Sequence, residues 1–232
     1  MLAGHFTTAL IAKQKFPKGT LLYFLTISQL QDFLWFTFHY LGIEPTNPSD
    51  AFDATLSNMV VDMLYSHDLL PQLFWLAIVF FLGKLLFKST KIGLVSGALV
   101  SIHFVLDFFS GHMHHIFGAN TMEAGLGFYA SNPYLAISIE ALFSFSALWY
   151  FFREEAKKEI IRTAKNRLAI ISVFAYGIIF MLLIATKSFR ELFGIPEFDL
   201  GFNTNMPTLI FTYGAMLYCL NDFVPKFTLK KI

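Results

Sequence analysis

Six stretches of the chain are apolar over about 20 residues, the helix length that crosses the roughly 30 Å hydrocarbon core of a membrane. Polar, turn-rich segments separate them. The stretches cover residues 20–42, 66–87, 91–111, 131–152, 167–186 and 207–225. The pattern predicts an all-α fold: a polytopic membrane helix bundle with about six transmembrane helices.

The segment before the first stretch is apolar but too short to cross a membrane. A helix from Met1 to Lys13 would rise roughly 18 Å, which reaches the middle of a bilayer. No basic residue precedes its apolar part and Lys13 follows it, so a cleaved signal peptide fits poorly. Two arrangements stay open: a re-entrant helix that enters the bundle, or an interfacial helix lying flat on the inner surface.

The composition supports a membrane protein and limits its partners. Hydrophobic residues make up 56% of the chain and charged residues only 14%, which is more apolar surface than one soluble domain of this length buries. The 17 basic residues nearly balance the 16 acidic ones, so no charge excess points to nucleic acid. Cys219 is the single cysteine, which excludes an intramolecular disulfide and a cysteine-rich metal site.

The basic residues predict the orientation of the chain. Of the 17 lysines and arginines, only Lys187 and Arg190 fall on one side of the predicted bundle. The rest precede the first stretch, join the second to the third and the fourth to the fifth, or follow the sixth. Because basic residues stay on the cytoplasmic side, both termini are expected in the cytoplasm, and an even number of spans agrees with this.

Several ionisable residues lie within the apolar stretches, where charge is costly and each such residue is a functional candidate. Asp32 lies in the middle of the first stretch and His67 opens the second. His103 and Asp107 lie in the third, four residues apart, which places both on one face of a helix. If the N-terminal segment enters the bundle, His5 reaches a similar depth.

Three imidazoles and two carboxylates would then form one metal site. Nitrogen and oxygen ligands of this kind suit zinc best here, with manganese or iron as alternatives. A metal with an open coordination position polarises a substrate and activates water, which is hydrolytic chemistry. Whichever carboxylate binds the metal less tightly, Asp107 or Asp68, would serve as general base.

Two further groups of polar residues, a run of histidines and Glu140, are not assigned as metal ligands. His112, His114 and His115 form the run HMHH in an outer segment and lack the spacing of a known zinc motif, so we interpret them as surface histidines. Glu140, within the fourth apolar stretch, is a candidate to support the metal ligands from behind.

The motifs MLAGHFTTALIAK, SQLQDFLW, YSHDLL, IHFVLDFF and GLGFY followed by IEALF occur in this order along the chain. In order and spacing they resemble the bacterial inner-membrane proteins described as LexA-binding, membrane-associated metal-dependent hydrolases. The resemblance covers about residues 1–153. It implies a bacterial inner-membrane location and a metal site formed by His5, Asp32, His67, His103 and Asp107.

The chain also departs from that family. The family often has a second acid and a histidine where this chain has Leu34 and Trp35, and His-Arg-Gly where it has residues 62–65. These losses would leave one metal instead of two, or a site without hydrolytic activity. Residues 154–232 have no counterpart; we expect a cytoplasmic connection and two additional transmembrane helices, which offer a surface for a protein partner.

Three functions are compatible with these observations. The first is a membrane-embedded metal-dependent hydrolase that acts on a lipid or another membrane-borne ester or phosphoester. The second is an ion-coupled or proton-coupled transporter whose acids and histidines bind the ion in transit. The third is a non-catalytic subunit of a membrane complex, in which the same residues bind partner helices. The sequence does not indicate an oligomeric state.

Overall fold

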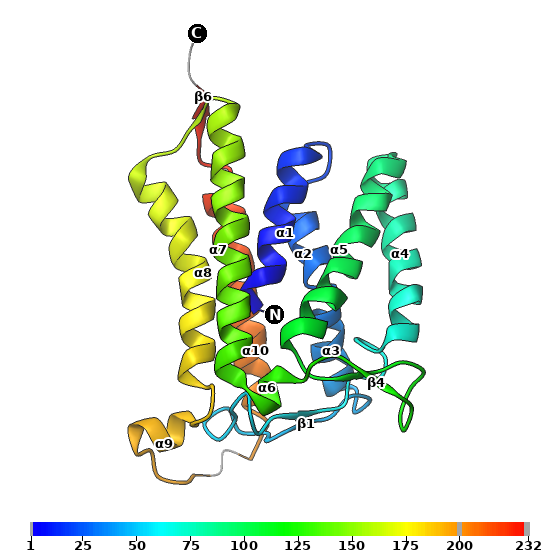
Figure 1. Ribbon diagram of the computed structural model, residues 1–232, viewed down its shortest axis with the longest axis vertical. Helices are drawn as coiled ribbons and strands as arrows, with labels where there is room; N and C mark the ends of the chain where they lie inside the picture. The colour runs from blue at the N-terminus through cyan, green and yellow to red at the C-terminus, as the bar shows by residue number, and fades with distance from the viewer. Residues whose placement is uncertain (1, 199–200, 230–232) are drawn as a thin grey trace.

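The computed structural model describes residues 2–198 and 201–229, which form a bundle of helices with short antiparallel strand pairs (Figure 1). The helices are α1 (Leu2–Lys15), α2 (Leu21–Ser28), α3 (Leu30–Tyr40), α4 (Leu69–Phe87), α5 (Thr90–Ser110), α6 (Phe128–Ser131), α7 (Pro133–Lys157), α8 (Ala164–Leu183), α9 (Phe189–Phe193) and α10 (Asn205–Phe223). The strand pairs are β1 (Thr46–Asn47) with β2 (Val60–Val61), β3 (His114–His115) with β4 (Glu123–Ala124), and β5 (Ile160–Ile161) with β6 (Thr228–Leu229). The helical fold agrees with the all-α prediction.

Four helices, α4, α5, α7 and α8, are long and apolar enough to cross a membrane. The first and sixth predicted spans have a different form. Residues 20–42 are divided at Gln29 into α2 and α3, and α10 is long enough but less apolar than the other four. The structure therefore supports membrane association through four helices, and the count of six comes from the sequence pattern alone.

Helix α1 runs into the bundle and is enclosed by other helices. It packs mainly against α2, α5 and α7, and ten of its 14 residues are buried. Small side chains such as Ala3, Gly4 and Ala9 allow this close packing inside a membrane protein. The flat interfacial arrangement is excluded for the described residues 2–15, and the re-entrant alternative fits.

The connections divide between the two ends of the bundle. Those between α1 and α2, α4 and α5, and α7 and α8 lie at the upper end in Figure 1, and the β1–β2 and β3–β4 pairs lie with α6 and α9 at the lower end. Most of the described basic residues lie at the upper end, and Lys187 and Arg190 lie at the lower end in and beside α9. Residues 1, 199–200 and 230–232, which include Lys230 and Lys231, lie outside the described residues.

Residues 154–232 pack into the same bundle as residues 1–153. Helices α8 and α10 contact each other, and both also contact helices from the first part of the chain. Gly177 of α8 permits the closest approach: a Cβ atom there would lie 3.1 Å from Met216 Cε of α10 and 3.4 Å from Ala3 Cβ of α1. The buried core is thus continuous across the boundary at residue 153.

Candidate metal centre

Four segments of the chain bring the five predicted ligands together in the interior. His5 comes from α1, Asp32 from α3, His67 from the turn before α4, and His103 and Asp107 from α5. Each is at most 6% exposed. Residues separated by as many as 102 positions in the sequence, from His5 to Asp107, thus form one cluster.

The spacing of the ligand atoms suits a metal ion. His103 Nε2 lies 3.1 Å from Asp107 Oδ2 and 3.8 Å from Asp32 Oδ2, and His5 Nε2 lies 3.3 Å from Asp107 Oδ1. His67 Nε2 lies 3.6 Å from Asp32 Oδ1 and 3.9 Å from Asp107 Oδ2. Two ligands of a tetrahedral zinc ion, each about 2.0 Å from it, lie roughly 3.3 Å apart.

The cluster contains two overlapping groups of three ligands. In one, atoms of His5, His103 and Asp107 lie within 4.8 Å of one another; in the other, atoms of Asp32, His67 and His103 do. Since His103 belongs to both, the buried residues could hold one ion or two neighbouring ions. Nothing in the arrangement identifies zinc rather than manganese or iron.

Hydrogen bonds orient two of the imidazoles toward the centre of the cluster. His103 Nδ1 lies 2.8 Å from the carbonyl oxygen of Ser28, to which only a protonated nitrogen can donate. A neutral His103 therefore presents the lone pair of Nε2 to Asp32 and Asp107. His67 Nδ1 similarly lies 2.8 Å from Ser66 Oγ. Metal-binding histidines are commonly fixed in this way through the ring nitrogen that does not bind the metal.

The resulting arrangement needs a positive charge at its centre. His103 Nε2 and Asp32 Oδ2 are both buried and have no hydrogen-bond partner among the described residues. A lone pair facing carboxylate oxygens in a buried place is unfavourable unless a proton or a cation lies between them. This observation on the polar atoms, independent of the sequence motif, fits a bound cation or a proton on His103 Nε2.

Glu140 of α7 fixes the end of α1 that carries His5. Its Oε1 accepts hydrogen bonds from the backbone amides of Ala3, at 2.5 Å, and Gly4, at 3.3 Å. These amides have no partner within α1, and a carboxylate interacts favourably with the positive end of a helix. Tyr129 Oη donates to the other oxygen, Oε2, at 3.2 Å. Glu140 therefore fixes the first residues of α1, directly before His5.

The interpretation of the HMHH run as surface histidines is wrong for His114. This residue is 3% exposed, its ring stacks on His67 with centroids 5.4 Å apart, and its Nε2 has no hydrogen-bond partner among the described residues. Burial lowers the pKa of His114 to about 3 and the pKa of His112 to about 4, so both are neutral near pH 7. The sequence signal that was missed is the position of the run directly after α5, which carries two of the ligands.

Asp68 takes a different place from the one we expected of a general base. It precedes α4, and its Oδ1 accepts a hydrogen bond from the backbone amide of His115 at 2.7 Å. Burial raises the pKa of Asp68 to about 6. Asp68 does not line the cavity beside the cluster and instead positions the β3–β4 pair, which leaves Asp107 as the better candidate base.

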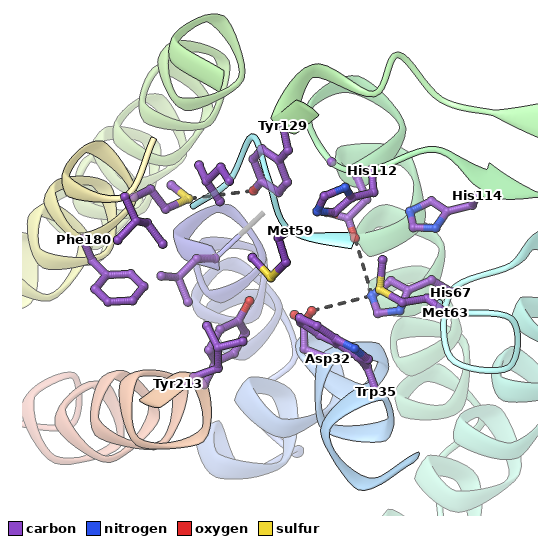
Figure 2. A pocket seen from close by; sticks show the side chains of 17 residues that line it. Asp32, Trp35, Met59, Met63, His67, His112, His114, Tyr129, Phe180 and Tyr213 are labelled. Atoms are coloured by element: carbon purple, nitrogen blue, oxygen red, sulfur yellow. Dashed lines mark hydrogen bonds and ion pairs between the residues drawn. The ribbon is translucent and has the colours of Figure 1, made fainter. Parts of the chain in front are cut away.

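A cavity of about 70 Å³ adjoins the cluster (Figure 2). Asp32, His67 and Asp107 reach its wall, so these three candidate ligands are accessible to a small molecule. His112 and His114 lie on the same side as His67 in Figure 2, and Phe180 and Tyr213 lie across from them. The last two residues belong to α8 and α10, so residues 154–232 supply part of the site.

Comparisons of the chain with protein-family models, with curated proteins and with solved structures find no match. The resemblance to the LexA-binding family of hydrolases therefore stays a prediction from short motifs.

Proposed function

We propose that this protein is a membrane-embedded, metal-dependent hydrolase of the bacterial inner membrane, related to the family that its motifs resemble. In this proposal α2 with α3 forms the first membrane pass and α10 the sixth, with both termini in the cytoplasm. The observation that carries the proposal is the buried cluster of three histidines and two aspartates at the wall of a cavity. A lipid or another membrane-borne ester or phosphoester is the substrate class.

The residues divide into those that hold the ion and one that moves a proton. His5, Asp32, His67 and His103 would bind the metal, for which zinc is the expected ion, and Asp107 would complete the set through one oxygen. When bound, the ion polarises the scissile carbonyl or phosphoryl group. As the oxygen of water bonds to the carbon or phosphorus, Asp107 accepts its proton and returns it to the leaving oxygen.

A second function, ion-coupled transport, is favoured by one observation. Transporters often bind their ions at broken or half-length helices near the middle of the membrane. Here α1 begins inside the bundle, and the first predicted span is broken at Gln29. The side-chain amide of Gln29 donates to the carbonyl of Leu2 at 3.1 Å. Helices α7 and α8 are continuous and do not repeat this break.

Elemental analysis of the purified protein after dialysis against a mild chelator tests the metal site. Wild type is expected to retain a divalent metal in a stoichiometric amount. Asp32→Ala and His103→Ala should lose it, because each removes a ligand of the cluster. His39→Ala is the matched control: it removes a histidine of α3 that lies 3.0 Å from Asn203 Nδ2, outside the cluster.

Hydrolysis and transport are then separated by activity. Release of product from ester and phosphoester lipids by wild type, lost in Asp107→Asn, supports the hydrolase. Ion flux into proteoliposomes without hydrolysis, lost in Asp32→Asn, would instead support the transporter and contradict the hydrolase. A wild-type protein without stoichiometric metal contradicts the metal-dependent hydrolase.

A further inference from the structure

The cavity beside the cluster has a polar end that is built to meet a ligand. Asp32, His67 and Asp107 line it together with His112 and His114. His114 is buried and its Nε2 lacks a hydrogen-bond partner among the described residues, which is costly unless a ligand or water occupies the cavity. Among the described residues, no lysine or arginine lines the cavity, so a head group would be recognised through hydrogen bonds and the metal.

The other end of the cavity is apolar and belongs mostly to the last two long helices. This end is lined by Phe180 and Met181 of α8, by Ile184 directly after α8, and by Leu209 of α10. Met59 also lines the cavity, and methionine side chains adapt readily to flexible apolar ligands. A molecule that fits both ends has a polar group joined to an apolar chain.

A separate groove lies on the outside of the bundle along the same two helices. This groove, about 510 Å³, runs between α8 and α10 and is lined by residues such as Val173, Tyr176 and Ala215. On α8 the groove residues precede those of the cavity and lie nearer the upper end of the bundle in Figure 1, and on α10 the two sets overlap in sequence at Phe211. Tyr176 Oη of α8 lies 3.5 Å from Thr212 Oγ1 of α10.

The segment between β1 and β2 covers the cavity at the lower end of the bundle in Figure 1. The backbone amide of Leu56 donates to the carbonyl of Ile184 at 2.7 Å, and that of Ser57 to the carbonyl of Ala185 at 3.3 Å. In contrast, α8 exposes Ile179 and other apolar side chains on its outer face. Access from the bilayer thus agrees better with the structure than access from water.

We propose that the substrate is a membrane amphiphile whose scissile group lies at the metal cluster and whose apolar chain lies along α8 and α10. The inference rests on the proposed function and names the substrate class of the same site. Residues 154–232 then serve as the chain-binding wall of the site. The cavity of about 70 Å³ holds the polar group and the first carbons, and the remaining chain lies in the groove between α8 and α10.

Fluorescence of Trp35 tests where the apolar chain of the amphiphile lies. Trp35 lines the cavity, and Trp75→Phe with Trp149→Phe leaves it as the only tryptophan of the chain. The protein is placed in bilayer nanodiscs of dioleoyl phosphatidylcholine and given decylphosphonate with a bromine on its third carbon. The bromine quenches a tryptophan only at close range, so we expect Trp35 to lose most of its fluorescence. Propylphosphonate with bromine on the same carbon should have little effect.

Two neighbouring substitutions on α10 provide the matched control. Leu209→Phe fills the apolar end of the cavity and should abolish quenching by the long probe. Ile210→Phe adds the same ring to a side chain that is 39% exposed on the outside of the helix, and should leave quenching unchanged. The metal content of both variants should equal that of wild type, because neither residue touches the cluster.

The possible outcomes separate the two proposals. Equal quenching by the long and short probes, or full quenching in Leu209→Phe, overturns the amphiphile inference while the metal site stands. Absence of metal overturns the proposed hydrolase function. Quenching of Trp35 then still reports whether the apolar chain of the probe binds in the cavity. Replacing the phosphonate by a hydroxamate distinguishes a phosphoester head from a carboxylic ester head: the better competitor shares the geometry of the substrate.

Discussion

Helices α1 and α4 are both rich in apolar residues, yet they occupy opposite environments. In α1, ten of 14 residues are buried within the protein. In the most apolar part of α4, only 17% of residues are buried, and side chains such as Leu85 and Leu86 are largely exposed. Mean hydropathy is 2.0 over that part of α4, so the more apolar helix is the less buried one.

The difference shows how a membrane protein distinguishes its interior from its lipid-facing surface. Lipid is as apolar as leucine, so large apolar side chains gain little by moving from lipid into the bundle. Small and polar residues do better inside, where backbones pack closely and hydrogen bonds form. Helix α1 contains Gly4, His5, Thr7 and Thr8, all of which are buried.

The largest expected effect comes from making the same substitution in both helices. Leu10→Ala in α1 removes a fully buried side chain and should lower the free energy of unfolding by about 2–5 kcal/mol, because a cavity remains. Leu85→Ala in α4 alters a side chain that is 73% exposed on the surface of the protein, and should change the free energy of unfolding little. Thermal unfolding in one detergent measures both, and equal losses would contradict the assignment of α4 to the surface.

Removing the metal should loosen α1 and leave α4 as it is. An ion present at 100 times its dissociation constant stabilises the folded state by about 2.7 kcal/mol. Chelation should therefore lower the melting temperature of wild type and speed amide exchange around His5. The melting temperature of His103→Ala should not respond to the chelator. Unchanged exchange in α1 would argue against His5 as a ligand.

Replacing Glu140 should weaken metal binding without removing a ligand. Glu140→Ala leaves the amides of Ala3 and Gly4 without their acceptor, and we expect metal affinity to fall roughly 10- to 100-fold, as for other residues that support ligands. Glu140→Gln keeps an oxygen acceptor and should recover part of the affinity. Glu154→Ala, on the same helix but beside Lys15 at the other end of α1 from His5, is the control. Competition with a fluorescent chelator measures all three.

The smallest effect is expected where α4 meets the rest of the protein. Its neighbour α5 approaches closely at Gly83, where a Cβ atom would lie 2.7 Å from Ser96 Oγ. Tyr23 Oη forms a 2.8 Å hydrogen bond with Ser96 Oγ at this contact. Tyr23→Phe should lower the free energy of unfolding by only about 0.6 kcal/mol, a typical value for such bonds between membrane helices. A loss as large as that of Leu10→Ala would mean that this contact holds α4 in place.

The sequence was sufficient to predict four long apolar helices and the five residues that the structure gathers in one buried cluster. Apolar length alone identified α4, α5, α7 and α8, because a membrane requires long uninterrupted runs. The five candidate ligands were found because an ionised side chain in an apolar stretch is rarely accidental. The spacing of His103 and Asp107 placed them on one face of α5, and the structure has them 3.1 Å apart.

Other parts of the site could not be predicted because they depend on tertiary contacts. Gln29 divides the first stretch, and no proline or glycine signals the break. The bond between Glu140 and α1 joins residues 137 positions apart. His114 resembles an exposed loop residue in sequence and is buried only because the β3–β4 pair folds over His67.

The anchoring of α1 by Glu140 also has a consequence for biosynthesis. All five candidate ligands have been translated by residue 107, but the carboxylate that holds α1 in place is added only at residue 140. Until α7 is inserted, the apolar side chains of α1 must be sheltered by lipid or by the insertion machinery. Metal loading would therefore be a late step in biogenesis. A chain truncated after residue 132 should contain every ligand and still bind metal poorly.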